Sequence, residues 1–334
     1  IDNTKGVVPY LAPEPDEFDL EVIKFRKSEI EETKFVPWRL RRGVYGQRQP
    51  DSQMMRIKIP GGLVNAEQLE ALAEITERFT PLKRGHITTR ENIQLHHVKL
   101  EDASTIMRIL GDTGLTTREA CGNTVRNVIA DPLVGIDPLQ VFDVIPYMVA
   151  FVRYFVRHPV TQNMPRKFKP AFSSGEHDPA LTAMHDIGFI ARIQEVDGVQ
   201  RKGFKIVVGG GTSIMAKIAS TLYEFVPIED YLRITEAVLR IFDRSEELRQ
   251  NKMMARIKVL IHRKGIDAFR EEVEKELEEP WATDGNFDPT PLMAFAQEIP
   301  PPLKADTYND SDDVQFLRWK KTNVFAQAQL GYYV

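Results

Sequence analysis

Cysteine is nearly absent from this chain: Cys121 is the single cysteine among 334 residues. One thiol cannot form an internal disulfide, nor a zinc or iron–sulfur site that needs several thiolates from the same chain. This scarcity fits a reducing compartment, and we expect a cytoplasmic protein. The sequence shows no signal peptide but opens at Ile1 rather than Met, so a plastid location is the alternative if a leader has been removed.

An excess of positive charge and a long apolar run are absent as well. The formal net charge is −4 and the pI is about 6.1, whereas a general nucleic-acid-binding protein usually carries a basic balance. The most apolar stretch, residues 141–156, is interrupted by Asp143, Pro146 and Arg153 and is too short to cross a bilayer. We therefore expect no nucleic-acid partner and no membrane partner, and any anion site must be a local concentration of cations.

Alternating strand and helix patterns predict a small α+β domain. Asn65 is a good N-cap for its first helix, with Gln68 in the answering position. This βαβα order predicts a ferredoxin-like domain over residues 51–118, after a charged, weakly periodic extension over 1–50. The expected elements are a strand at 54–59, a turn at 60–62, a helix ending at 79, a strand at 86–98 and a helix at 101–110.

A second unit, of α/β type, is expected over residues 119–280. Residues 281–320 are rich in proline and aspartate and predict a linker. The elements expected in the second unit are a buried helix at 140–157, strands at 188–194 and 203–208, and helices around 234–242 and 269–277.

A short internal repeat suggests a duplication, although a match of this length could be coincidence. It predicts that residues 321–334 begin a second ferredoxin-like copy, so that the chain is half of a duplicated protein. The first copy reads Gly43-Val44-Tyr45-Gly46-Gln47-Arg48-Gln49, and the second reads Asn323-Val324-Phe325-Ala326-Gln327-Ala328-Gln329.

A basic segment bounded by two prolines, residues 165–170, offers the first candidate site. Proline at both ends disfavours a helix, and in an extended chain Lys167 and Lys169 project to one side with Phe168 opposite. Two adjacent ammonium groups repel each other unless an anion lies between them. A solvated loop is the alternative.

The predicted strand at 86–98 carries polar side chains on one face if no bulge intervenes. Thr88, Arg90, Gln94 and His96 share this face, which could also be an exposed face of an antiparallel sheet. A metal site at His96-His97 is disfavoured, because neighbours on a strand point to opposite faces.

Two arginines and a glycine loop complete the candidates. Arg56 interrupts an apolar strand, and Arg126 lies in a polar loop, although isolated arginines are usually surface residues. Gly209-Gly210-Gly211 lacks the signatures of a Walker motif and of a dinucleotide fingerprint. A close backbone approach to a flat ligand, or an anion nest, remains as its role.

Taken in order, several segments resemble the sirohaem-dependent sulfite and nitrite reductase family. The resemblance implies a ferredoxin-like (parachute-type) domain followed by an α/β sirohaem-binding domain, as the first half of a pseudo-twofold duplicated architecture. The segments are Met55-Arg56-Ile57-Lys58-Ile59-Pro60-Gly61-Gly62, Thr88-Thr89-Arg90-Glu91-Asn92-Ile93-Gln94-Leu95-His96, Cys121-Gly122-Asn123-Thr124-Val125-Arg126-Asn127, Pro165-Arg166-Lys167-Phe168-Lys169, Val208-Gly209-Gly210-Gly211-Thr212-Ser213 and Arg256-Ile257-Lys258.

The resemblance also implies residue roles. Arg56, Arg126, Lys167 and Lys169 match the cations that hold the oxyanion on the distal face of the sirohaem. The positions that match contacts to the macrocycle are Thr88, Arg90, Gln94, His96, Arg166, Gly209, Gly210, Gly211 and Lys258.

By the same resemblance, the intact enzyme reduces sulfite to sulfide with six electrons from ferredoxin or a flavoprotein. Its [4Fe–4S] cluster would be bound by four cysteines in a C-terminal half that this chain lacks, so the chain alone is expected to be inactive. Nitrite reduction to ammonia is one alternative, and Lys169 favours sulfite because nitrite-specialised members often carry a neutral residue there. A non-catalytic tetrapyrrole- or anion-binding half-protein is the alternative from another class.

Two positions qualify the resemblance. His86 stands where some relatives place a further cofactor-binding arginine, which puts that contact in doubt. Tyr45 and Cys121 match a pair that some relatives link covalently. An inert, buried Cys121 is the competing interpretation.

Overall fold

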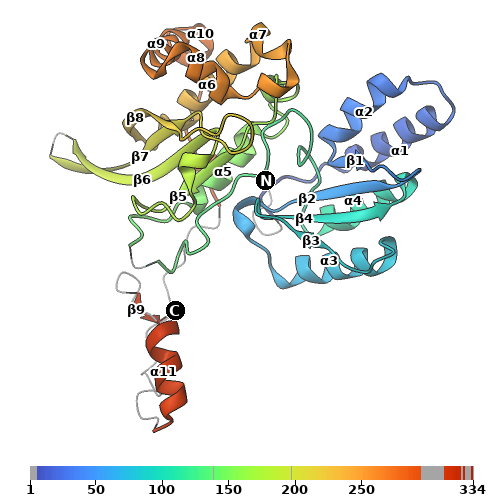
Figure 1. Cartoon of the computed structure of the whole chain (residues 1–334), viewed down its shortest axis with the longest axis horizontal. Coiled ribbons are helices and arrows are strands. Elements are labelled where there is room, and N and C mark those ends of the chain that lie inside the picture. Colours follow the sequence, from blue (N-terminus) through green and yellow to red (C-terminus); the bar gives the residue numbers. More distant parts are fainter. Residues whose placement is uncertain are drawn as a thin grey trace.

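The computed structural model describes residues 6–137, 139–196, 198–294, 312–324, 326–327 and 332–333. Two four-stranded sheets, each packed with helices, lie side by side in Figure 1. The helices of the N-terminal third of the chain pack on the first sheet, and the helices between residues 145 and 283 belong to the unit of the second sheet. The predicted α+β class is confirmed.

The first unit is built on an antiparallel sheet in the order β1-β2-β4-β3. Met55 and Ile57 of β2 and Leu95 of β4 are fully buried and form the centre of its core. The strands are β1 (Val44–Gly46), β2 (Gln53–Lys58), β3 (His86–Ile87) and β4 (Asn92–Val98), and the helices are α1 (Pro13–Arg26), α2 (Glu32–Arg41), α3 (Ala66–Phe79) and α4 (Ala103–Asp112). The predicted capping box of Asn65 and Gln68 begins α3.

The segment expected as an extension supplies two helices and a strand to this unit. Phe18 of α1 and Phe35 of α2 lie in the same core as β2 and β4, and Phe25 stacks on Phe35 with ring centroids 4.2 Å apart. The few apolar positions of each helix sit among many charges, so periodicity alone did not reveal them.

The continuous strand predicted over 86–98 is wrong. A turn separates β3 from β4, with the Glu91 N–H donating to Thr88 O at 3.0 Å and a φ of +51° at Glu91. A second irregularity at His97 (φ +60°) accompanies a shift in the β2–β4 register. Thr88 and Arg90 therefore lie in the turn and not on a strand face, because turns and bulges break the two-residue alternation.

The second unit is built on a sheet in the order β5-β6-β7-β8, in which only β5 and β6 are parallel. The predicted strands lie inside β6 and β7, and the predicted helices overlap α5, α6 and α9. The strands are β5 (Pro170–Ser173), β6 (Ile187–Val196), β7 (Val199–Val208) and β8 (Ser220–Pro227), and the helices are α5 (Ile145–Phe155), α6 (Tyr231–Asp243), α7 (Glu246–Arg249), α8 (Ile257–Lys264), α9 (Ile266–Glu276) and α10 (Pro280–Thr283).

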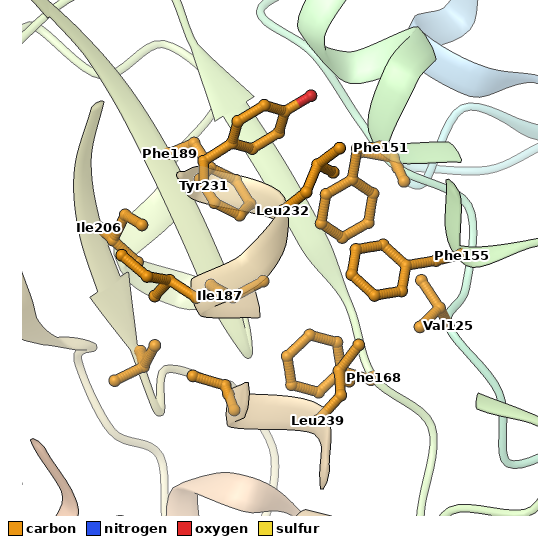
Figure 2. Packing of buried hydrophobic residues seen from close by; sticks show 14 of the residues in the cluster. Val125, Phe151, Phe155, Phe168, Ile187, Phe189, Ile206, Tyr231, Leu232 and Leu239 are labelled. Atoms are coloured by element: carbon orange, nitrogen blue, oxygen red, sulfur yellow. The ribbon is translucent and has the colours of Figure 1, made fainter. Parts of the chain in front are cut away.

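Aromatic rings dominate the core of the second unit (Figure 2). Phe189 of β6 packs edge-on against Phe151 of α5, with ring centroids 5.6 Å apart. Tyr231 of α6 is fully buried, and its hydroxyl donates to Tyr147 O at 2.8 Å. Phe168 belongs to the same core and anchors the basic segment to it. Among the described helices, none combines the length and apolarity needed to cross a bilayer.

The described part of the C-terminal region repeats features of the N-terminal one. The hairpin of β9 (Ala326–Gln327) and β10 (Tyr332–Tyr333) pairs Ala326 with Tyr333, as Gly46 pairs with Gln53 the same number of residues earlier. The helices before the two hairpins carry matching stacked pairs, Phe35–Trp38 in α2 at 5.8 Å and Phe316–Trp319 in α11 (Val314–Asn323) at 6.0 Å. The duplication stays a prediction, and α11 begins within the range expected as linker. Phe325, Ala328 and Gln329 of the repeat lie outside the described residues.

Candidate functional site

The basic segment at residues 165–170 is not helical, as predicted, and at Phe168 it pairs in parallel with the loop that carries Arg126. Arg126 donates its N–H to Phe168 O at 2.8 Å. Phe168 is fully buried, whereas Lys167 and Lys169 are partly exposed on the opposite side. Arg126 is the first of the charges that act on Lys167, whereas Lys169 lies nearer to Arg90 and Arg256.

Arg56 and Arg126 converge on one backbone oxygen. Ala120 O accepts from Arg126 Nη1 at 2.9 Å and from Arg56 Nη1 at 3.4 Å, and Gly122 O accepts from Arg126 Nε at 3.0 Å. With its amide turned so that the oxygen faces Arg56, Gln94 accepts from Arg56 Nη2 at 2.7 Å. Carbonyl and amide oxygens thus hold both guanidinium groups without neutralising them.

We call Arg56, Arg126, Lys167, Lys169 and Arg256 the cation cluster. A buried carboxylate, which the sequence did not single out, organises one side of it. Asp186 is fully buried and accepts from Arg256 Nη2 at 2.7 Å and from Arg256 Nε at 2.9 Å. Its Oδ2 also accepts from the main-chain N–H of Lys169 at 2.8 Å. Arg256 was noted from the sequence only as part of a segment that resembles the family, with no role assigned to it. The bidentate geometry shows that Asp186 orients its guanidinium group.

Asn127 ties the turn that carries Arg90 to the rest of the site. Its Nδ2 donates to Ile59 O at 2.7 Å and to Arg90 O at 3.0 Å. In return, Arg90 Nη1 donates to Pro170 O at 3.2 Å and to Asn127 O at 3.3 Å. Arg90 reaches the cluster from a turn, so its position depends on the tertiary fold and could not be predicted from strand periodicity.

Crowded positive charge changes the acidity of these side chains. Burial, followed by repulsion from Arg126 and other arginines, lowers the pKa of Lys167 to about 8. Burial and repulsion from Arg90 lower the pKa of Lys169 to about 8 as well. Burial lowers the pKa of Arg126 to about 10, with a further contribution from Arg56. Each charge therefore disfavours the others until an anion is present.

Counter-charges are scarce in this part of the described chain. The cluster contains one ion pair, Arg256–Asp186. Arg56, Arg126, Lys167 and Lys169 have no carboxylate oxygen within 4.0 Å of their charged nitrogens among the described residues. Four cations that lack such partners concentrate positive charge at this point of the described chain.

Three further predicted residues lie around this cluster. Thr88 Oγ1 accepts from the N–H groups of Arg90 and Asn92, each at 3.3 Å, and so shapes the turn. Arg166 is partly exposed, and its charge contributes to lowering the pKa of Lys167. Burial lowers the pKa of His96, with smaller contributions from His86, His97 and Arg56.

The glycine loop is held by the protein itself. The N–H groups of Gly209, Gly210 and Gly211 donate to backbone oxygens at 2.8–3.0 Å, so these three cannot form an anion nest. Gly210 is required by packing, because a Cβ there would lie 2.3 Å from Ala183 O. Lys258 Nζ donates to Thr212 O and Ile214 O at 2.9 Å and thereby fixes the loop.

The suggested pair of Tyr45 and Cys121 has contrasting surroundings. The Cys121 side chain is 2% exposed, with Sγ 3.9 Å from Gly43 O, and burial raises the pKa of its thiol. Tyr45 lies two residues after Gly43 and is 52% exposed. A covalent bond between them stays a prediction.

Two models of known protein families match this chain. The model for the nitrite/sulfite reductase ferredoxin-like half domain matches residues 45–112. The model for the nitrite and sulphite reductase 4Fe-4S domain matches residues 121–281. The chain belongs to the nitrite and sulphite reductase family. Ala120, whose carbonyl oxygen accepts from both arginines, lies between the two matched ranges.

Individual relatives cover a similar part of the chain. A protein named sulfite reductase [ferredoxin] 1, from Mycolicibacterium paratuberculosis, is 34% identical over 67% of this chain and 39% of its own length. A ferredoxin–nitrite reductase from Leptolyngbya laminosa is 32% identical over 77% of this chain and 53% of its own length. The solved structure of Mycobacterium tuberculosis NirA matches with a TM-score of 0.68 and 28% identity, covering 83% of this chain and 51% of that one. The chain spans about half the length of the relatives it matches.

Proposed function

We propose that this chain forms half of a sirohaem-dependent sulfite reductase, in which Arg56, Arg126, Lys167 and Lys169 bind the oxyanion. The observation that supports the proposal most strongly is their convergence without a carboxylate partner in the described chain. A dianion would interact with each cation by ~4 kcal/mol at ~4 Å and an effective dielectric of ~20, before desolvation. Four such contacts can outweigh repulsion from an anionic cofactor.

The residues present fit a cofactor rich in carboxylates. Arg90 and Arg166 carry guanidinium groups that are not used in ion pairs within the described chain, and guanidinium is the preferred partner for such groups. Gln94, His96 and Thr88 would complete the edge contacts, while Lys258 would act through the loop of Gly209–Gly211 that it holds. When bound, sirohaem would supply the electrons for reduction of the oxyanion.

The two lysines are suited to move protons as well as to bind charge. A pKa of about 8 leaves Lys167 and Lys169 mostly protonated at neutral pH, yet makes them better acids than ordinary lysines. Their ammonium groups would donate hydrogen bonds to the oxyanion oxygens, which leave as water during reduction. We assign them the role of proton donors at those oxygens.

The iron–sulfur cluster does not fit the residues of this chain. The single cysteine, Cys121, is buried, and a [4Fe–4S] cluster usually needs four thiolates. We propose that a C-terminal half supplies these ligands. We propose ferredoxin as the electron donor, because the names of the relatives include it, and a flavoprotein is the alternative. The proposed location is the cytoplasm, and the plastid is the alternative because some relatives are named as chloroplastic.

Nitrite is the alternative substrate, and Lys169 supports sulfite because its extra positive charge favours a dianion over a monoanion. The alternative from another class is a half-protein that binds an anion or a tetrapyrrole without catalysis.

Calorimetric titration of sulfite into the purified chain tests the anion site, and an absorption spectrum of protein from cells that make sirohaem tests the cofactor. We expect sulfite binding that the double variant K167M/K169M loses and the exposed control K99M keeps. We also expect a coloured protein. Absence of sulfite binding in the unmodified chain would contradict the proposal, whereas a colourless chain that binds sulfite would favour the non-catalytic alternative.

A further inference from the structure

A cavity of about 330 Å³ lies between the two units, and none of the residues of the cation cluster lines it. We call it the inter-unit cavity. Leu63 and Val64 line it from the first unit, Val134 and Ile145 line it from the second, and Val8 closes it from the N-terminal segment. Leu63 and Val64 are about 40% exposed and mark its solvent side. Small-molecule sites commonly occupy such apolar clefts between domains, with volumes of ~300–1,000 Å³.

Lys58 supplies a charged group to this apolar cavity. It follows Arg56 on the face of β2 that points away from the core residues Met55 and Ile57, and therefore toward the second unit. Lys58 is 2% exposed. Its Nζ makes one hydrogen bond among the described residues, to Val125 O at 3.5 Å, although an ammonium group has three donors.

An ammonium in this position is costly without a partner. Burial lowers the pKa of Lys58 to about 8, with Glu119 opposing the shift and Arg126 adding to it, and no carboxylate oxygen of the described chain lies within 4.0 Å of Nζ. The acidic residue of the described lining, Asp143, accepts the Ile145 N–H at 2.9 Å. An anion from outside the chain would stabilise the charged form of such a buried group.

We propose that the inter-unit cavity binds a small molecule with one carboxylate and an aliphatic tail, held by Lys58 at the carboxylate and by the apolar lining along the tail. The walls disfavour a fully hydrated inorganic oxyanion, because most of them offer no hydrogen-bond partner. This site is separate from the cation cluster and does not rest on the proposed function.

Octanoate titrated calorimetrically into the purified chain tests the proposal, with acetate and octanol as probes that lack the tail or the charge. We expect octanoate to bind at least about tenfold more tightly than either probe, which corresponds to ~1.4 kcal/mol. K58M should weaken octanoate binding by at least about tenfold, while K99M should leave it unchanged. V64W, which keeps Lys58 but fills the solvent side of the cavity, should also abolish binding.

A crossed measurement separates this site from the oxyanion site. K167M should lose sulfite affinity and keep octanoate affinity, and K58M should show the reverse, with thermal unfolding used to confirm that each variant is folded. Octanoate binding that K58M leaves intact, that octanol matches, or that sulfite displaces would overturn the proposal. Absence of octanoate binding at millimolar concentration would overturn it as well.

Discussion

The cation cluster has two corners that hold their positive charges in different ways. At the Ala120 corner, Arg56 and Arg126 donate to a shared carbonyl oxygen. At the Asp186 corner, a buried carboxylate binds Arg256 through two nitrogens and fixes the main chain of Lys169. The first corner keeps its net charge, whereas the second gives up one unit of charge for a fixed geometry.

This difference separates two tasks that a basic pocket must perform. A carbonyl oxygen orients a guanidinium without cancelling its charge, so the charge stays available to a ligand. A carboxylate orients more strongly and cancels one charge, which suits a group that supports the site from behind. Loss of the first kind of contact should therefore affect anion binding, and loss of the second should affect stability.

The largest effect is expected for Asp186→Asn. The substitution leaves Arg256, whose side chain is 13% exposed, without its fully buried counter-charge, and breaking a buried ion pair typically costs ~3–5 kcal/mol. Urea denaturation followed by circular dichroism should show a loss of this order. The matched control is Arg263→Met, which removes a half-exposed pair with Glu247 and should cost at most ~1 kcal/mol. Equal losses in both variants would mean that Asp186 does not organise its corner.

The next effect contrasts one arginine from each corner. Arg126→Met should weaken sulfite binding by ~10–100-fold, the range expected for one lost charge-assisted hydrogen bond of ~1.5–3 kcal/mol, with a smaller change in stability. Arg256→Met should mainly lower the free energy of unfolding and change sulfite affinity less, because it leaves the Asp186 carboxylate buried and unpaired. Calorimetry should be used to measure sulfite affinity, and urea denaturation to measure the free energy of unfolding, for both variants. If both variants lose affinity and stability in the same proportion, the two corners do not differ in function.

Much of the fold was accessible from periodicity and capping alone. The capping box of Asn65 and Gln68 located a helix because the signal is local, and the proline-bounded segment at 165–170 was not helical, as expected. The prediction of one continuous strand over 86–98 was wrong because its turn and its bulge depend on positive φ angles at Glu91 and His97. Neither residue is glycine, so the sequence gives no local signal of these angles.

The site was predictable only in part, for a related reason. Residue type and resemblance singled out Arg56, Arg126 and Lys169, which have no carboxylate partner in the described chain. Asp186 and Asn127 were missed because their importance comes from contacts with segments distant in sequence, and an isolated Asp or Asn has many ordinary uses. Tertiary structure was needed to show which carbonyl groups and which cations they hold.

A smaller effect is expected from pH, and it tests the crowding of charge that both corners share. The pKa of about 8 for Lys167 and Lys169 lies below the usual lysine value of 10.5. Anion affinity requires the ammonium forms, so the affinity for sulfate, which stays a dianion across this range, should be highest below pH ~7 and fall as the pH rises through about 8. K167M/K169M should flatten this profile of calorimetric affinity. A wild-type profile that stays constant up to pH ~10 would contradict the crowding.

The same shift has a consequence for stability with the opposite sign. Between pH ~8 and ~10.5 the unfolded chain binds more protons than the folded one, so the free energy of unfolding should rise with pH across this window. Saturating sulfite should reduce the slope, because a bound anion restores the lysine pKa values. The double variant should reduce the slope without abolishing it, since Lys58 titrates in the same range.

The smallest expected effect is a change of preference, from Lys169→Asn. The main-chain bond of residue 169 to Asp186 survives this substitution, so the corner should keep its shape and lose only the ammonium charge. A dianion loses more attraction than a monoanion when one cation is removed. The ratio of sulfite to nitrite affinity at pH ~8 should therefore fall by ~3–10-fold, corresponding to ~0.7–1.4 kcal/mol. K99N serves as the surface control, and an unchanged ratio in K169N would show that selectivity comes from the Ala120 corner, where the net charge is kept.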